Sequence, residues 1–259
     1  MADSNTKTLI VAGVLCGICS VLVAGSVVMF RPQQQVNQAL DQKKNILQSA
    51  GLYESKETID SIYSKYVTPV VVDLETGDIA TDIDAAKFDQ DKADKDPQYS
   101  QSIEKSKDVA AIGSRSRLQK AYLIKNEQGL DQIVLHVYGK GLWSTMKGFL
   151  SVDKDGVTVR GFNYYSHGET PGLGGEIENP KWLASWKGKK LYDDSGSFTP
   201  KTRVMKGQVN PQHPEAEYAV DGLSGATLTA NGVQSTFRFW FSESGYKNFL
   251  AKVREGDIQ

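Results

Sequence analysis

The sequence is poor in cysteine: there are two in 259 residues, and both lie near the N-terminus. Cys16 and Cys19 fall inside an uncharged apolar stretch, so the rest of the chain has no thiol for a disulfide or a cysteine-bound metal. If that stretch is a lipid-facing helix, the two sulfurs lie one turn apart, and no second pair completes four zinc ligands. We therefore interpret both cysteines as small apolar side chains.

The sequence also lacks a surplus of charge of either sign. It has 30 lysines and arginines against 31 acids, for a net charge of -1. Because the two signs are interspersed, no basic face is available to bind the phosphates of DNA or RNA. Residues 73–107 alternate Asp and Lys, which predicts a solvated surface segment. We expect no nucleic-acid partner and no metal site.

Charge is absent altogether from residues 9–30. As a helix this stretch is about 33 Å long, and the hydrocarbon core of a bilayer is about 30 Å thick. A cleaved signal peptide has an apolar region of only about 7 to 15 residues behind a basic region, whereas Lys7 alone precedes this one. We predict that residues 1–32 are a single transmembrane anchor in contact with membrane lipid.

The charges that flank this anchor are weak indicators of its orientation. Lys7 precedes it, and Arg31, Lys43 and Lys44 follow it. By the positive-inside rule this small excess favours a cytoplasmic location for the C-terminal part of the chain.

Beyond the anchor, the apolar residues of 36–52 recur at helical spacing, and Gly51 is a plausible stop. We assign residues 33–116 to a helical and polar connecting region that packs on the main domain, residues 117–259. Four β-rich runs separated by glycine-containing turns predict an antiparallel sheet: residues 122–125, 132–138, 148–152 and 157–165.

Within the second run, Ile133, Leu135 and Val137 alternate with Val134, His136 and Tyr138, as in a half-buried strand. Apolar stripes at i, i+3, i+4 then predict two C-terminal helices, at residues 228–241 and 246–253. Helices packed on an antiparallel sheet define an α+β fold.

Residues 167–176 follow the last predicted strand and are rich in glycine. They read His-Gly-Glu-Thr-Pro-Gly-Leu-Gly-Gly-Glu. Such glycines allow positive φ angles and a close approach of the backbone to a flat or anionic ligand, but they suit a wide surface loop equally well. No Gly-Lys-Ser/Thr follows, so the segment is not a phosphate-binding P-loop.

Residues 221–229 form a second segment of small and polar residues, Asp-Gly-Leu-Ser-Gly-Ala-Thr-Leu-Thr, and run directly into a predicted helix. Free N–H groups at a helix start form a seat for a phosphate. Ser224 or Thr227 is also a suitable N-cap residue. The residue types alone favour the cap and leave the phosphate seat as the alternative.

The run Ser-Gly-Ala-Thr followed by Leu-Thr resembles the flavinylation motif of FMN-binding domains, and the glycine-rich loop resembles the second signature of those domains. The beginning of the chain agrees with one family that carries this domain. Over its whole length the sequence resembles the C subunit of the sodium-translocating NADH:quinone oxidoreductases, and four N-terminal runs contribute to that resemblance: Cys-Ser-Val-Leu-Val from Cys19, Arg-Pro-Gln from Arg31, Lys-Asn-Ile-Leu from Lys44 and Ala-Gly-Leu from Ala50.

This resemblance implies FMN bound covalently through a phosphoester to Thr227, attached by a flavin transferase that uses FAD. It implies that Ser224, Gly225 and Ala226 line the phosphate end. The loop residues expected near the flavin ring are Glu169, Thr170, Leu173, Gly174 and Gly175. We add Trp143 as an aromatic wall and Lys206 as a cation near the phosphate or the reduced flavin.

The resemblance further implies a single-pass protein of the bacterial inner membrane whose main domain is periplasmic, contrary to the flanking charges. Its partners would be the other subunits of the reductase. The chain would relay electrons as one subunit of this enzyme, with no catalytic residue and no complete active site of its own.

Two alternatives remain at this point. One is the related flavoprotein subunit of a ferredoxin-linked, ion-translocating electron transport complex, although the long segment between Arg31 and Arg117 favours the C subunit of the sodium-translocating enzyme. The other is a tethered, non-redox binding module in which Ser-Gly-Ala-Thr only caps a helix.

Overall fold

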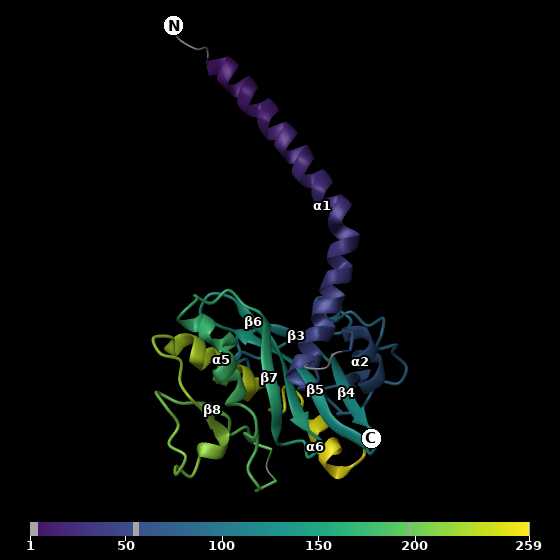
Figure 1. Ribbon diagram of the computed structural model, residues 1–259, viewed down its shortest axis with the longest axis vertical. Helices are drawn as coiled ribbons and strands as arrows, with labels where there is room; N and C mark the ends of the chain where they lie inside the picture. Colours follow the sequence, from purple (N-terminus) through teal and green to yellow (C-terminus); the bar gives the residue numbers. More distant parts are fainter. Residues whose placement is uncertain (1–4, 54–56, 197, 259) are drawn as a thin grey trace. The chain divides into compact units, whose positions relative to one another are not determined.

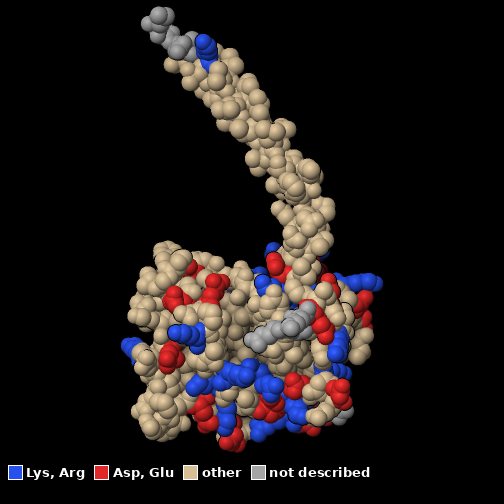
Figure 2. Space-filling view, viewed as in Figure 1, with Lys and Arg blue, Asp and Glu red and all other residues tan. Residues whose placement is uncertain are grey.

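The computed structural model describes residues 5–53, 57–196 and 198–258. The chain divides into two compact units, Met1–Lys43 and Lys44–Gln259. Most of the first unit is helix α1, which runs Asn5–Ser49 and continues into the second unit. A window of this helix has a mean hydropathy of 2.4 and no buried residue, and its N-terminal part carries few charged side chains (Figure 2). By length and composition it is a candidate membrane span.

Two separate helices were expected on either side of residue 32, and the structure has one. Pro32 lies inside α1, where its ring removes one backbone hydrogen bond, yet the helix continues to Ser49. The predicted boundary after residue 32 therefore falls within a helix, and the compact second unit begins at Lys44.

A five-stranded antiparallel sheet forms the centre of the second unit (Figure 1), and its strand order is β1-β4-β5-β6-β7. It confirms the predicted α+β class, and each of the four predicted strands is present. The strands are β1 (Val67–Asp73), β4 (Leu118–Asn126), β5 (Gly129–Lys140), β6 (Thr145–Asp153) and β7 (Val159–Ser166).

The sheet is buried on both faces. Ile133, Leu135 and Val137 lie in the main core, whereas Val134 lies in a smaller core with Ile46 and other apolar residues near the end of α1 and in α2 (Ile59–Tyr66). His136 and Tyr138 are each only 7% exposed. The prediction of a half-buried strand for β5 was therefore wrong, because helices cover both sides.

Two C-terminal helices, α5 (Thr227–Trp240) and α6 (Lys247–Glu255), contribute their apolar faces to the main core, as predicted. The indole N–H of Trp240 donates to the carbonyl oxygen of Tyr138 in β5, at 2.6 Å. Between the helices the chain turns tightly, and a Cβ on Gly245 would meet the carbonyl oxygen of Trp240. Only glycine fits this turn.

The polar segment 73–107, predicted as a solvated surface segment, contains short helical and strand elements. It contains α3 (Gln90–Ala93) and β2 (Ser100–Ser102), which pairs with β3 (Ser114–Ser116). Strand β5 pairs with β4 only from Ala121 onwards. Before Ala121, where β5 does not pair with β4, the side chain of Gln90 accepts from the N–H of Lys120 and donates to the carbonyl oxygen of Leu118. Gln90 thus supplies hydrogen-bond partners to this unpaired stretch of β4.

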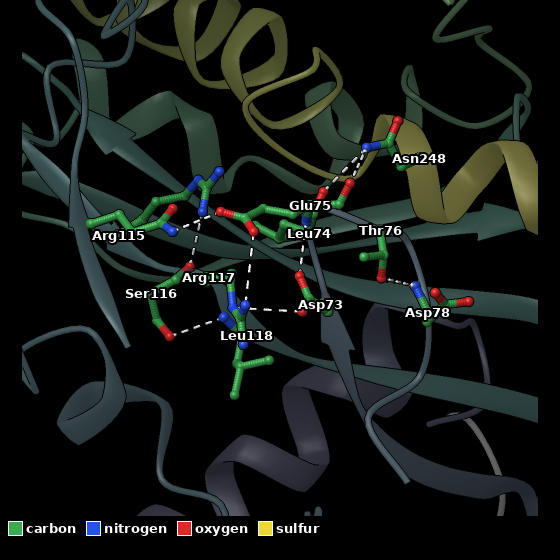
Figure 3. A network of polar contacts seen from close by, with 11 residues as sticks. Asp73, Leu74, Glu75, Thr76, Asp78, Arg115, Ser116, Arg117, Leu118 and Asn248 are labelled. Atoms are coloured by element: carbon green, nitrogen blue, oxygen red, sulfur yellow. Dashed lines mark hydrogen bonds and ion pairs between the residues drawn. The ribbon is translucent and has the colours of Figure 1, made fainter. Parts of the chain in front are cut away.

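A polar network joins the end of β1 to β3, β4 and α6 (Figure 3). The guanidinium of Arg117 lies 3.5 Å from Asp73 and 3.8 Å from Glu75. On the α6 side, the amide of Asn248 donates to the carbonyl oxygens of Leu74 and Glu75. This network fixes the turn after β1 on α6.

Short elements complete the unit and lead toward the glycine-rich segments. They are η1 (Gly174–Glu178), α4 (Pro180–Ala184), β8 (Arg203–Val204), η2 (Ala216–Tyr218) and β9 (Ala219–Val220). Strands β8 and β9 pair in parallel, which brings residues 203–207 alongside the chain that leads into α5.

Candidate functional site

Helix α5 begins at Thr227, and its N-cap residue is Ala226, which makes no side-chain cap hydrogen bond. The expectation that Ser224 or Thr227 caps this helix was therefore wrong. Alanine is among the least favourable N-cap residues because it cannot accept from the first free N–H groups. A helix start without a side-chain cap is the place where a bound anion would supply the missing acceptor.

The residues that surround this helix start are accessible and conformationally permissive. Ser224, Gly225 and Thr227 are exposed, while Ala226 is buried. Gly225 has a φ of 69°, a left-handed conformation that side chains rarely adopt. The threonine hydroxyl and the backbone around it thus face solvent at the positive end of the helix dipole.

The glycine-rich loop lies against this helix start. A Cβ on Gly225 would come within 3.0 Å of a methyl carbon of Leu173, and one on Gly174 would come within 2.5 Å of the hydroxyl oxygen of Thr229. Thr170 turns the loop, since its carbonyl oxygen accepts from the N–H groups of Leu173 and Gly175 at 3.1 and 2.9 Å. The two segments singled out in the sequence are therefore neighbours.

Glu169 has a buried side chain within the loop, at 5% exposure. Its Oε1 accepts from the N–H groups of Trp143 and Ser144, at 3.0 and 3.4 Å. Its Oε2 accepts from the N–H of Leu142 at 3.2 Å and from the hydroxyl of Thr229 at 2.5 Å. The carboxylate joins the β5–β6 turn, residues 141–144, to the first turn of α5.

Burial disfavours the charged form of Glu169 and acts to raise its pKa. The hydrogen bonds from Thr229 and from the three N–H groups of the turn oppose that effect and outweigh it, so the pKa of Glu169 lies below its usual value. The side chain is therefore an anion at neutral pH.

His167, at the start of the loop, lies between the backbone of Glu169 and the side chain of Glu178. Its Nδ1 accepts from the N–H of Glu169 at 3.1 Å, and its Nε2 lies 2.9 Å from a carboxylate oxygen of Glu178. The hydroxyl oxygen of Ser144 accepts from the N–H of Gly168 at 2.6 Å, so the loop and the turn are bonded at a second point.

Large apolar side chains are exposed around this site. Trp143 is 66% exposed, Leu228 61%, Leu173 45% and Leu142 43%. They come from the β5–β6 turn, the glycine-rich loop and the first turn of α5. Exposed apolar groups beside an anion seat suit a ligand that has a flat aromatic part and a phosphate.

The structure brings together all but one of the predicted site residues. Trp143 belongs to the turn held by Glu169, as above. Lys206 is exposed and follows β8, beside Gly222, whose N–H donates to the carbonyl oxygen of Gly207 at 2.8 Å. Lys206 thus lies near the beginning of the 221–229 segment, with no described contact to Thr227.

Sequence reasoning missed three contributors: Leu142, Ser144 and the buried Thr229. The available signal was the position of residues 139–141, a Gly-Lys-Gly turn between two predicted strands. A tight turn directs several N–H groups to one side, where a single carboxylate can accept them.

Comparison with known proteins places this site in a familiar domain. The FMN-binding domain family matches residues 141–242, which include the turn, the loop and the whole of α5. The chain is 45% identical to the C subunit of the Na(+)-translocating NADH-quinone reductase of Yersinia pestis, over 99% of this chain and 96% of that protein. It is 44% identical to the C subunit of the same reductase from Pseudomonas aeruginosa, over 98% of each.

Solved structures agree with the sequence relatives. The crystal structure of NqrC from Shewanella oneidensis is similar with a TM-score of 0.76 at 34% identity, and the match covers 83% of this chain and 97% of that one. The crystal structure of the C subunit of the Na(+)-translocating NADH-quinone reductase from Parabacteroides distasonis matches with a TM-score of 0.65 at 28% identity, over 85% and 96%.

Proposed function

The chain belongs to the family of the C subunits of Na(+)-translocating NADH-quinone reductases, and on that basis we propose that it carries FMN through a phosphoester bond to Thr227. Membership of this family, together with the FMN-binding domain, makes the chain a flavoprotein subunit of such a reductase. FMN supplies the redox chemistry, accepting electrons and passing them on. The remaining task of the protein is to hold, orient and tune it.

The observation that carries the covalent assignment is the start of α5. Thr227 is exposed at the first helical position, directly after an alanine N-cap that leaves the first N–H groups without a side-chain acceptor. A phosphate esterified to that hydroxyl would lie at the positive end of the helix dipole. Thr229 is a poor alternative, because it is 1% exposed and its hydroxyl donates to Glu169.

In this proposal Ser224, Gly225 and Ala226 line the phosphate end. Thr170, Leu173, Gly174, Gly175 and Trp143 surround the ring, and Lys206 contributes positive charge at the approach to the site. Leu142 and Leu228 also belong to the ring environment in this proposal, because both are apolar and exposed beside the start of α5.

Mass spectrometry of the full chain, purified after co-expression with an FAD-dependent flavin transferase, tests the attachment. We expect an added mass equal to FMN less one water, located on Thr227 by fragmentation. The Thr227→Ala variant should lose it, whereas Thr68→Ala, at an exposed threonine of β1 outside the site, should keep it. An unmodified wild-type chain, or flavin retained in Thr227→Ala, would contradict the proposal.

We further propose that the chain relays electrons between other redox centres of the assembled reductase, with the remaining subunits as its partners. In the purified complex, NADH should reduce the flavin on this subunit before quinone is reduced. A complex containing Thr227→Ala should then oxidise NADH with artificial acceptors but lose quinone reduction. Unimpaired quinone reduction in that complex would rule out a relay through Thr227.

The location of the main domain is a separate proposal. We propose that α1 anchors the chain in the bacterial inner membrane and that the domain after it is periplasmic, as the family resemblance implies. Alkaline phosphatase fused to the C-terminus folds only outside the cytoplasm, so the fusion should be active. An inactive fusion that accumulates to a normal level would place the domain in the cytoplasm, as the flanking charges suggest.

A further inference from the structure

The geometry points to Glu169 as a positioning residue that locks the β5–β6 turn onto the first turn of α5, and thereby orients Trp143 and Leu142 beside the flavin attachment site. This inference rests on the proposed attachment of FMN at Thr227. It assigns Glu169 to the protein framework and not to contact with the ring.

The hydrogen-bonding capacity of the Glu169 carboxylate is fully used inside the protein. A carboxylate offers about four acceptor sites, and Glu169 accepts four hydrogen bonds, two at each oxygen. Three of the donors are consecutive N–H groups of the turn, and the fourth is the hydroxyl of Thr229. A ligand has no free acceptor to use at this side chain.

Space around the carboxylate is also filled. A Cβ on Gly141 would come within 2.5 Å of Oε1, and one on Gly174 within 2.9 Å of Oε2. Both positions are glycine, one in the turn and the other at the start of η1. The backbone therefore closes around Glu169 from two segments, and neither segment admits a larger residue without moving the carboxylate.

Hydrogen bonds alone compensate the charge of Glu169. Within the described ranges 5–53, 57–196 and 198–258, no lysine, arginine or histidine forms an ion pair with this carboxylate. A buried anion is unfavourable unless its hydrogen bonds are satisfied, so the turn and Thr229 must stay in place for the charge to be tolerated. The carboxylate therefore holds the turn in place, and the turn and Thr229 in return stabilise the charge of the carboxylate. Opening the turn would leave the anion without its hydrogen bonds.

The functional effect follows from what the turn carries. Trp143 and Leu142 expose their side chains at the tip of the β5–β6 hairpin, while their N–H groups point back to Glu169. Thr229 lies two residues beyond Thr227 on α5. One carboxylate thus sets the position of an aromatic and an aliphatic side chain relative to the helix start.

Three variants of the full chain, purified in detergent, test this inference. Glu169→Gln keeps the shape but replaces one acceptor oxygen with an NH2 donor. Thr229→Val keeps the shape and removes a single donor, in case Glu169→Gln does not fold. Glu178→Gln is the control, because it removes a carboxylate of the same region that pairs with His167 and not with the turn.

Two measurements are needed. In the flavin-free chains, amide hydrogen exchange at residues 142–144 should be roughly tenfold faster in Glu169→Gln, and faster to a lesser degree in Thr229→Val, because charge-assisted hydrogen bonds are lost. In the flavinylated chains, the fluorescence anisotropy of the flavin should fall in the same order. Glu178→Gln should leave both measurements at the wild-type value.

Unchanged exchange at residues 142–144 in Glu169→Gln would overturn the inference. Faster exchange with unchanged flavin anisotropy would also overturn it, because the lock would then serve the fold alone. A wild-type chain that takes up no flavin would overturn the proposed function and this inference together. A flavinylated wild type beside an unaffected Glu169→Gln variant overturns the inference only.

Discussion

Gly232 of α5 lies so close to Lys140 of β5 that a Cβ on the glycine would come within 2.5 Å of the lysine carbonyl oxygen. The same Cβ would lie 3.2 Å from Cα of Gly141. These two atoms belong to backbone, so they cannot rotate away as the third neighbour, the Cε of Met146, can. Helix α5 therefore rests on the sheet through a residue without a side chain, next to the turn that Glu169 holds.

Gly232→Ala should destabilise the protein. In an ordinary helix interior this substitution stabilises by about 1 kcal/mol, but overpacking against backbone here should lower the free energy of unfolding by about 1–3 kcal/mol. Urea unfolding of the full chain in detergent measures the change. Asn231→Ala, at the exposed neighbouring position, should raise stability by a few tenths of a kcal/mol. A Gly232→Ala variant more stable than wild type would refute the close contact.

The contribution of Glu169 to stability should depend on pH in one direction. Its pKa is lowered from the usual 4.5 in the folded chain, so its contribution is complete above that value and is lost as the pH falls through the folded pKa. The difference in unfolding free energy between wild type and Glu169→Gln should be constant from about pH 7 to about pH 5, and shrink below about pH 4. A difference that grows on acidification would contradict the shift.

His136 should make the protein sensitive to mild acid. Burial, with a smaller effect of Lys147, lowers the pKa of His136 from 6.5 to about 4, and its Nε2 is 2.8 Å from the hydroxyl of Tyr165. Between these two pKa values the unfolded chain binds a proton that the folded chain does not, so stability falls as the pH is lowered.

The expected loss across that interval is on the order of 3 kcal/mol at this one residue. Urea unfolding at a series of pH values should show a flatter curve for His136→Phe than for wild type. His213→Phe, at an exposed histidine, serves as the control and should follow the wild-type curve. Parallel curves for wild type and His136→Phe would show that His136 titrates normally.

Trp143→Ala should separate stability from flavin binding. The side chain is 66% exposed, so its loss should change the free energy of unfolding by no more than about 0.5 kcal/mol. The flavin, if Trp143 is a wall of its site, should become more mobile and its fluorescence anisotropy should fall. Leu40→Ala, in the exposed part of α1, is the control. Equal anisotropy in Trp143→Ala and wild type would remove Trp143 from the site.

The elements with a strong hydrophobic period were predictable. In strands β4 to β7 and helices α5 and α6, the apolar residues recur with the period of a strand or a helix over enough residues to identify the element. Strand β1 was missed because Pro69 interrupts Val67–Asp73, although proline is tolerated on an edge strand and β1 is the edge strand of the five-stranded sheet, next to β4. The run Val70, Val71 and Val72 was the signal that should have revealed it.

The site was predictable in its residues but not in their arrangement. The motif Ser-Gly-Ala-Thr locates the helix start, yet propensity assigns the cap to a hydroxyl residue and the structure places Ala226 there. The Thr229 hydroxyl and Glu169 are 60 residues apart in sequence. The residues next to Glu169 or Thr229 in sequence do not identify the two as partners, because they come together only in the folded chain.

The two threonines of the first turn of α5 differ in their exposure to solvent. Successive helical residues turn by about 100°, so positions two apart face nearly opposite directions; Thr227 is exposed and Thr229 is 1% exposed. Under the proposed attachment of FMN, an enzyme acting on the finished fold would therefore meet one threonine hydroxyl at this helix start, and folding itself would select Thr227 over Thr229.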